Sequence, residues 1–150
     1  LGIGVGLALG AKINKNDYLT VVLLGDGECH EGSVWEAAMF AGSRELNNLI
    51  AIVDRNRQCV TDFTEDCCRL EPLKDKWESF GWDAAIINGH SFVDLLAAFK
   101  DFRSRKSPKP LAVIANTIKG KGISFMERNL CWHHNVPGGK DLEVARQELS

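Results

Sequence analysis

The sequence lacks the features that mark membrane proteins and nucleic-acid-binding proteins. Its longest apolar stretch, Leu1 to Ala11, is interrupted by four glycines, and it is shorter than the roughly 20 residues that cross a bilayer. The charged start and cleavage site of a signal peptide are also missing. The net charge is −2, so no basic excess is available to follow a phosphate backbone. We therefore expect neither a membrane nor a nucleic acid among the partners.

Two cofactor and metal signatures are absent as well. The five cysteines are odd in number and show no C-x-x-C spacing for zinc. Free thiols in a reducing cytoplasm are the simplest expectation, and for the adjacent pair Cys67 and Cys68 we expect free, partly buried thiols more than a redox-active pair. No G-x-G-x-x-G follows the first predicted strand, which argues against an ordinary dinucleotide-binding oxidoreductase.

What is present is the composition of one globular domain. The chain has 150 residues, of which 45% are hydrophobic and 25% charged, and chains of this size fold around one core. No repeat or linker divides it, so residues 1–150 are expected to form a single domain. The chain begins at Leu1 without an initiator Met, inside helix-compatible sequence, and we expect an N-terminal segment to be missing upstream.

Strand and helix patterns alternate along the chain. Four short runs rich in β-branched residues predict strands buried on both faces: 19–24, 49–53, 84–87 and 111–115. Helical spacing occupies 34–41, 73–80 and 92–102, with one face formed by Trp35, Ala38, Met39 and Gly42 in the first helix and by Val93, Leu96, Ala97 and Phe99 in the last. This order predicts an α/β fold, a parallel sheet with helices on both faces.

Polar residues follow the first two predicted strands. Gly25-Asp26-Gly27 comes directly after one strand, and Asn56 follows the next. The glycines allow a tight turn, and the following helix begins with unpaired N–H groups that favour an anion. A carboxylate and an amide oxygen at neighbouring strand ends suit Mg²⁺ bound to a diphosphate. The tripeptide alone is typical of a turn, but its position after a strand, with Asn56 about 30 residues later, favours a cofactor site.

These residues lie within a longer pattern that resembles the N-terminal half of a transketolase. The spacing of Gly25-Asp26-Gly27 and Asn56 is similar to the thiamine diphosphate fingerprint. The likeness is strongest to the short bacterial subunits of split transketolases and covers nearly the whole chain. It rests on the segments 25–37 (GDGECHEGSVWEA), 46–50, 70–73, 76–77, 80–82, 89–90, 117–122, 125–127 and 132–133.

The resemblance implies a thiamine diphosphate binding fold, here its diphosphate-binding domain, and assigns roles to single residues. The metal ligands would be Asp26, Asn56 and the backbone carbonyl of Gln58, with Mg²⁺ as the ion and Ca²⁺ or Mn²⁺ as substitutes. Contacts to the cofactor would come from Gly25, Asp26, Gly27, Glu28, Asn56 and His133, with the Gly27 N–H directed at the diphosphate. Catalytic roles would belong to Glu31, in a carboxylate network at the subunit interface, and to His133, beside the donor substrate.

Without the resemblance, several of these residues have simpler interpretations. Glu31 is favoured near a helix N-terminus by the helix dipole alone. Lys119 and Lys121 attract phosphate or belong to a solvated loop.

Three positions depart from the family pattern: Cys59, Asp62 and His134. We expect these departures to affect the preference for donor and acceptor sugars more than cofactor binding.

The function implied is transfer of a two-carbon ketol unit from a ketose phosphate to an aldose. The chain would be the N-terminal subunit of a two-component cytoplasmic enzyme, paired with a companion subunit that carries the pyrimidine-binding domain, in a dimer or heterotetramer. Two alternatives remain open. One is another thiamine diphosphate enzyme, of the 1-deoxyxylulose-5-phosphate synthase or 2-oxo acid dehydrogenase E1 type. The other is a non-catalytic assembly subunit.

Overall fold

The computed structural model describes all residues 1–150 and is built on a four-stranded parallel sheet. The strands lie in the order β1-β2-β4-β3, with β1 at Thr20–Gly25, β2 at Leu49–Arg55, β3 at Asp83–Asn88 and β4 at Leu111–Asn116. All four predicted strands are confirmed, each within two residues at either end. The register pairs Gly25 with Asp54, so the segments that follow β1 and β2 emerge side by side.

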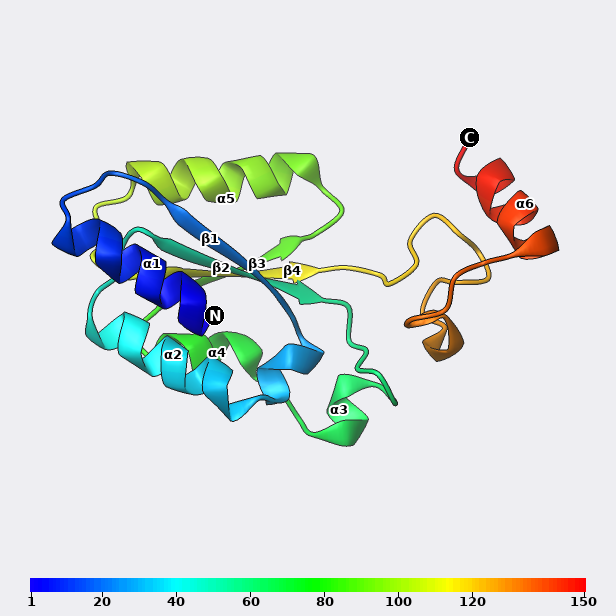
Figure 1. The fold of residues 1–150 in the computed structure, drawn as a ribbon, viewed down its shortest axis with the longest axis horizontal. Coiled ribbons are helices and arrows are strands. Elements are labelled where there is room, and N and C mark those ends of the chain that lie inside the picture. Colours follow the sequence, from blue (N-terminus) through cyan, green and yellow to red (C-terminus); the bar gives the residue numbers. More distant parts are fainter.

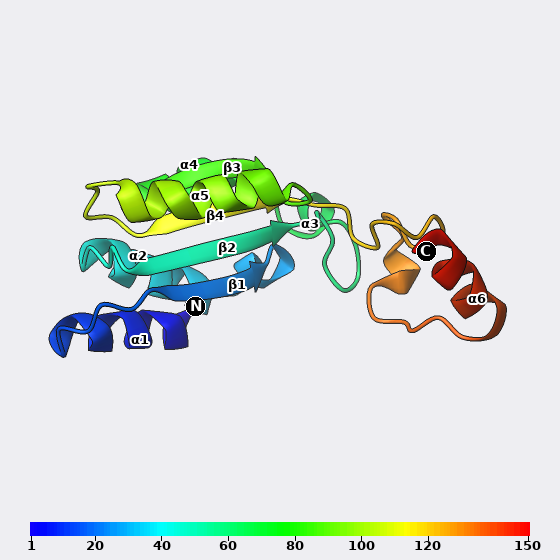
Figure 2. The same cartoon turned by 90° about the horizontal axis from the view of Figure 1, so that it is seen from above.

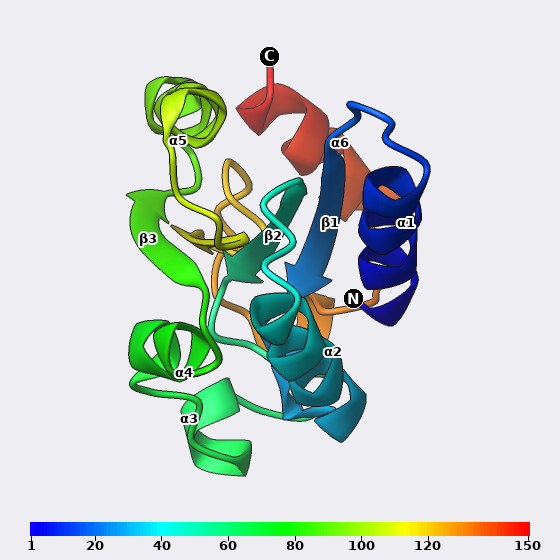
Figure 3. The same cartoon turned by 90° about the vertical axis from the view of Figure 1, so that its left-hand side faces the viewer.

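Helices cover both faces of this sheet, as predicted. Figure 1 shows α5 (Phe92–Ser104) above the sheet, with α1 (Gly2–Ile13), α2 (Gly32–Ser43) and α4 (Leu73–Ser79) below it. The end-on view of Figure 3 shows the same layers. Three further helices are short: η1 (Gly27–His30), α3 (Thr64–Cys67) and η2 (Leu130–Trp132). None of the helices is long and apolar enough to span a membrane.

The main core lies between the sheet and the lower helices. Trp77 and Trp82 are fully buried there with their rings 4.9 Å apart, and the Trp82 indole N–H donates to the Ala38 carbonyl at 2.8 Å. The predicted face of α2 was partly wrong. Met39 is exposed, and Val34, Ala38 and Ala41 form the buried side. The small residues at 38 and 41 allow α2 to approach the sheet closely.

Two other predictions of burial were also partly wrong. In α5, Val93 and Leu96 are exposed, and the packed side contains Ala98, Phe99 and Phe102. The strands are not all buried on both faces, because Leu23 of the edge strand β1 is 72% exposed. The single helix α5 packs on β3 and on the centre of the sheet and leaves β1 uncovered on that side.

The chain after β4 forms an extension beyond the carboxyl ends of the strands. Figure 2 shows this segment and the terminal helix α6 (Gly139–Glu148) set apart from the sheet. Two short hydrogen bonds join Glu148 of α6 to Ser124, at 2.6 Å from the backbone N–H and 2.5 Å from the hydroxyl. The extension lies beyond the carboxyl ends of the strands, and two of its residues, Lys119 and His133, line the same cavity as residues that follow β1 and β2.

Candidate functional site

A cavity of about 440 Å³ lies at the carboxyl edge of the sheet, next to the extension. Ligands in open α/β sheets gather at this edge. All eight site residues predicted from the sequence line this one cavity, although they come from three separated parts of the chain. Its lining consists of Gly25, Asp26, Gly27, Glu28, Glu31, Asp54, Asn56, Gln58, Cys59, Val60, Lys119 and His133.

Asp26 is the most constrained of these side chains. It directly follows β1, caps η1 and is only 1% exposed. Its Oδ1 accepts a hydrogen bond from the Gly27 N–H at 2.9 Å, whereas Oδ2 accepts from the Arg55 guanidinium at 2.9 Å and from the Arg57 N–H at 2.6 Å. A carboxylate oxygen has two lone pairs. Oδ1 therefore keeps one for a metal ion, while Oδ2 is fully used.

Asn56 follows β2 and is held by its neighbours in a similar way. Its Oδ1 accepts from the Gln58 N–H at 3.0 Å, and its Nδ2 donates to Asp54 Oδ2 at 3.3 Å. The other Asp54 oxygen accepts from the Thr117 hydroxyl, which ties the end of β2 to the residue after β4. Asn56 Oδ1 thus also keeps one lone pair while its orientation is fixed.

The third predicted metal ligand is the Gln58 carbonyl, and it accepts no hydrogen bond within the chain. A Cβ placed on Gly27 would lie 3.6 Å from this oxygen and 3.2 Å from the Cys59 Cβ. The absence of a side chain at Gly27 therefore lets the 58–59 backbone approach the turn after β1. No group of three or more His, Cys, Asp or Glu side chains is arranged to hold a metal ion, so a cation here would use one carboxylate, amide and backbone oxygens, and oxygens of its ligand.

These residues fit a hard cation bound to a diphosphate, because three oxygen acceptors with spare lone pairs line one cavity. The Gln58 side chain adds a second indication. It is 2% exposed, yet neither its Oε1 nor its Nε2 has a partner. Buried polar atoms nearly always form hydrogen bonds, so a polar group from outside the chain is expected to bond to both atoms. No pattern in the sequence indicated a role for this side chain.

The two glutamates of the first loop differ in their surroundings. Glu28 Oε2 accepts from the Gly25 N–H at 3.3 Å and closes the turn after β1. Glu31 precedes α2, is exposed and makes no side-chain cap to the helix. The Glu31 carboxylate therefore lies free at the rim of the cavity. The Gly27 N–H, predicted to bind the diphosphate, donates to Asp26 in this structure, and its cofactor contact stays a prediction.

The extension supplies the opposite side of the cavity through His133 and Lys119. Burial, followed by the nearby charges of Lys119 and His134, lowers the pKa of His133 from its usual value of 6.5. The imidazole is therefore neutral at neutral pH, and its buried Nδ1 has no partner. Of the two lysines considered from the sequence, only Lys119 lines the cavity, whereas Lys121 lies outside it and pairs with Glu127 at 3.4 Å.

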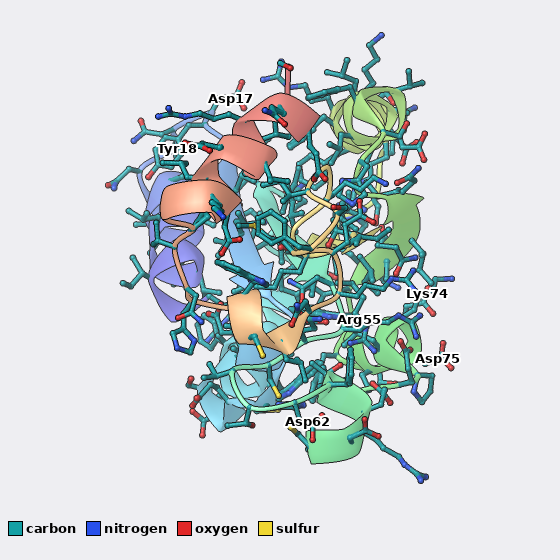
Figure 4. All side chains as sticks on the ribbon, turned by 90° about the vertical axis from the view of Figure 1, so that its right-hand side faces the viewer. Asp17, Tyr18, Arg55, Asp62, Lys74 and Asp75 are labelled. Atoms are coloured by element: carbon teal, nitrogen blue, oxygen red, sulfur yellow. The ribbon has the colours of Figure 1, made fainter.

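A buried arginine connects the cavity to the segment around α3. Arg55 is 1% exposed and bonds to Asp26, Glu65 and Glu71 at 2.8–2.9 Å. Burial alone would lower the pKa of its guanidinium, but hydrogen bonds to the three carboxylates outweigh burial and raise it. Figure 4 shows Arg55 toward the middle of this end of the molecule. The sequence predicted Asp26 as a metal ligand without indicating that an arginine holds it.

The chain is also similar to known proteins. Residues 9–150 match the family described as transketolase, thiamine diphosphate binding domain. The chain is 45% identical over its whole length to one of the subunits of the apulose-4-phosphate transketolase of Phocaeicola vulgatus, covering 53% of that protein. It is 42% identical over 87% of its length to a 6-deoxy-6-sulfo-D-fructose transketolase subunit of a Clostridium species, covering 47% of that protein. The chain thus spans about half the length of these relatives.

A solved structure shows the same fold. Transketolase from Campylobacter jejuni superposes with a TM-score of 0.89 at 29% identity, over 97% of this chain and 24% of the other. The predicted α/β fold is therefore confirmed.

Proposed function

Because the chain belongs to the transketolase family, in its thiamine diphosphate binding domain, we propose that it holds Mg²⁺ and thiamine diphosphate as one subunit of a two-subunit transketolase. The reaction would move a two-carbon ketol unit from a ketose phosphate to an aldose. One observation carries the proposal: the eight residues that the sequence predicted as the site line one cavity at the carboxyl edge of the sheet.

In this proposal the chain binds and orients the cofactor. Asp26, Asn56 and the Gln58 carbonyl hold the metal ion, and Lys119 adds a positive charge on the other side of the cavity. When bound, thiamine diphosphate supplies a carbon nucleophile and an electron sink for breaking a carbon–carbon bond beside a carbonyl. Neutral His133 exchanges hydrogen bonds with substrate through its free Nδ1. The named relatives act as transketolases, which favours ketol transfer over the other reactions of this cofactor.

A companion subunit would complete the site. Both split relatives are named as subunits, and apolar side chains are exposed on two elements of this chain. They are Ile3 and Leu7 of α1 and, on the opposite face of the sheet, Val21 and Leu23 of the edge strand β1. Permanent subunit interfaces are apolar and commonly bury more than about 2,000 Å².

Because all five cysteines are free, a cytoplasmic setting is part of the proposal.

Ketol transfer is expected only when this polypeptide and its companion are combined. The test mixes the two purified polypeptides with Mg²⁺, thiamine diphosphate, a ketose phosphate panel and aldose acceptors, and identifies the products by mass spectrometry. Each polypeptide by itself serves as the control. Full turnover by this polypeptide alone would contradict the division of the site between two chains. Absence of ketol transfer by the mixture with every donor would contradict the transketolase reaction.

The Glu31→Gln variant should lower kcat at least about tenfold, because Glu31 is a free carboxylate at the rim of the cavity and positioned acids and bases contribute at least that much. Metal affinity should change less than about threefold, since Glu31 is not a proposed ligand. Steady-state kinetics and metal titration of the assembled enzyme measure both. Glu36→Gln, an exposed glutamate of α2 outside the cavity, is the matched control. Unchanged kcat in Glu31→Gln would leave Glu31 as a residue favoured only by the helix dipole.

A further inference from the structure

Two cysteines lie in contact beside the cofactor cavity. The Sγ atoms of Cys59 and Cys67 are 2.9 Å apart, and the residues are eight positions apart in sequence. A disulfide bond requires about 2.05 Å, so less than about 1 Å of approach separates the thiols from a bond. The resemblance in sequence marked Cys59 as a position that departs from the family pattern.

The backbone on both sides holds the two sulfur atoms together. Gln58 and Phe63 form an isolated antiparallel bridge, and the Cys59 N–H donates to the Asp62 carbonyl at 2.8 Å. Cys67 ends α3, whose first residue, Thr64, accepts a hydrogen bond from buried Arg55 at 2.7 Å. The approach of the sulfurs thus results from a closed loop anchored to the core, and Figure 4 shows Asp62 of this loop at the edge of the molecule beside α3.

No other pair of thiols has this arrangement. Cys29 is buried, and burial, with Asp26 and Glu28 nearby, raises the pKa of its thiol to about 12. Cys68 follows Cys67 directly, but it is the Cys68 carbonyl that has a partner, the His30 ring at 2.8 Å. Cys67 and Cys68 are both exposed, which corrects the expectation of partly buried thiols. The sulfur neighbour of Cys67 is Cys59 and not the adjacent cysteine.

We propose that Cys59 and Cys67 form a reversible oxidation site whose co-reactant is a hydroperoxide. The sulfur of one thiol attacks a peroxide oxygen, an S–O bond forms as the O–O bond breaks, and the thiol proton passes to the departing oxygen. The products are a sulfenic acid and an alcohol or water. The second thiol then attacks the sulfenic sulfur, the S–O bond breaks and water leaves with the displaced proton. Two thiols are oxidised, one peroxide is reduced, and a Cys59–Cys67 disulfide remains. A dithiol reductant reverses the change by exchange.

Oxidation at this site weakens binding of the metal-bound cofactor, an effect that rests on the proposed function. Cys59 lines the cavity, and its Cβ lies against Gly27. Cys59 also follows Gln58, whose carbonyl is a proposed metal ligand. Bringing the sulfurs to bonding distance moves Cys59 by several tenths of an ångström. Mg²⁺ demands near-ideal octahedral geometry, and the distances from the ion to its ligands vary by only about 0.2 Å. Movement of Cys59 displaces the neighbouring Gln58 carbonyl, and this lowers the affinity for the metal-bound cofactor.

The first arm of the test locates the bond. The reduced protein is treated with hydrogen peroxide, alkylated and digested with trypsin, which leaves Cys59, Cys67 and Cys68 in one peptide, Gln58–Arg69. We expect this peptide to lose two hydrogens, carry one alkyl label on Cys68, and recover all three labels after dithiothreitol. Cys59→Ser and Cys67→Ser should abolish the bond, and Cys68→Ser should retain it. A label on Cys59 with a Cys67–Cys68 bond, or no bond at all, overturns the proposal.

The second arm measures thiamine diphosphate binding in Mg²⁺ by calorimetry, using the assembled complex in reduced and oxidised forms. We expect the oxidised form to bind at least about fivefold more weakly, and Cys67→Ser treated with peroxide to bind like the reduced protein. Equal affinity of both forms overturns the coupling to the cavity. Absence of binding in the reduced complex would instead contradict the proposed function, while the disulfide result of the first arm stands by itself.

Discussion

Asp26→Asn should reduce the Mg²⁺-dependent affinity of the assembled enzyme for thiamine diphosphate at least about 100-fold. The substitution removes the only buried carboxylate of the proposed metal site, whereas the asparagine side chain keeps the shape of the aspartate. The fold should survive, because Arg55 keeps its contacts with Glu65 and Glu71. Isothermal titration calorimetry measures the affinity, and circular dichroism confirms that the sheet is intact.

Two comparisons make the Asp26 result specific. Asp62→Asn changes the same residue type on the loop outside the cavity lining, where its Oδ1 accepts only from the Phe63 N–H, and it should bind cofactor like wild type. A chelator should reduce wild-type binding to the level of Asp26→Asn. If Asp26→Asn binds as tightly as wild type, or if the chelator has no effect, Asp26 is not a ligand of an essential metal ion.

Arg55→Met should lower the free energy of unfolding by about 3–5 kcal/mol, the usual cost of removing one partner from a buried ion pair. The variant leaves Asp26 buried without its cation and removes the link to Glu65 and Glu71. Urea denaturation followed by tryptophan fluorescence measures the loss. Arg69→Met is the matched control, since Arg69 is exposed and makes no ion pair, and it should change stability by less than about 0.5 kcal/mol. Equal stability of the two variants would show that the Arg55 cluster does not stabilise the fold.

The same cluster should make wild-type stability sensitive to acid. Burial works against the charged form of Glu65, but the hydrogen bond from Arg55 lowers its pKa below the usual 4.5. The Leu73 N–H, and then Arg55, lower the pKa of Glu71. A carboxyl with a depressed pKa stabilises the fold above its unfolded pKa, and this stabilisation disappears as the pH falls through the folded value. In Arg55→Met, this part of the acid dependence should be smaller.

The sequence alone was sufficient to predict the sheet and the residues on one side of the candidate site. Continuous apolar runs indicate parallel strands, and neighbouring strand ends bring Asp26 and Asn56 together without further information. The position of His133 came only from the family resemblance, because nothing in the local pattern of the extension indicates where it folds back. The Cys59–Cys67 contact was likewise hidden, since it depends on the loop between them.

Helix periodicity also predicted some packing faces wrongly, and for a physical reason. Apolar residues on α5 and β1 mark surfaces that avoid water, but the pattern cannot tell whether the chain itself or another molecule covers them. Val93 and Leu96 are exposed on α5, and Leu23 is exposed on β1. A single helix covers only part of a four-stranded sheet. The buried positions of α5 are those that face the covered part.

The extension gives the two sides of the cavity different local stabilities. Beyond β4, Ala145 is the only buried residue, whereas the strand residues beside Asp26 and Asn56 belong to the main core. Segments with few buried apolar contacts open locally at much lower free energy than a core sheet. Amide protons around Lys119 and His133 should therefore exchange with solvent long before those of β1 and β2. A ligand enclosed between the two sides can leave when the extension opens, while the sheet and its metal-binding residues remain folded.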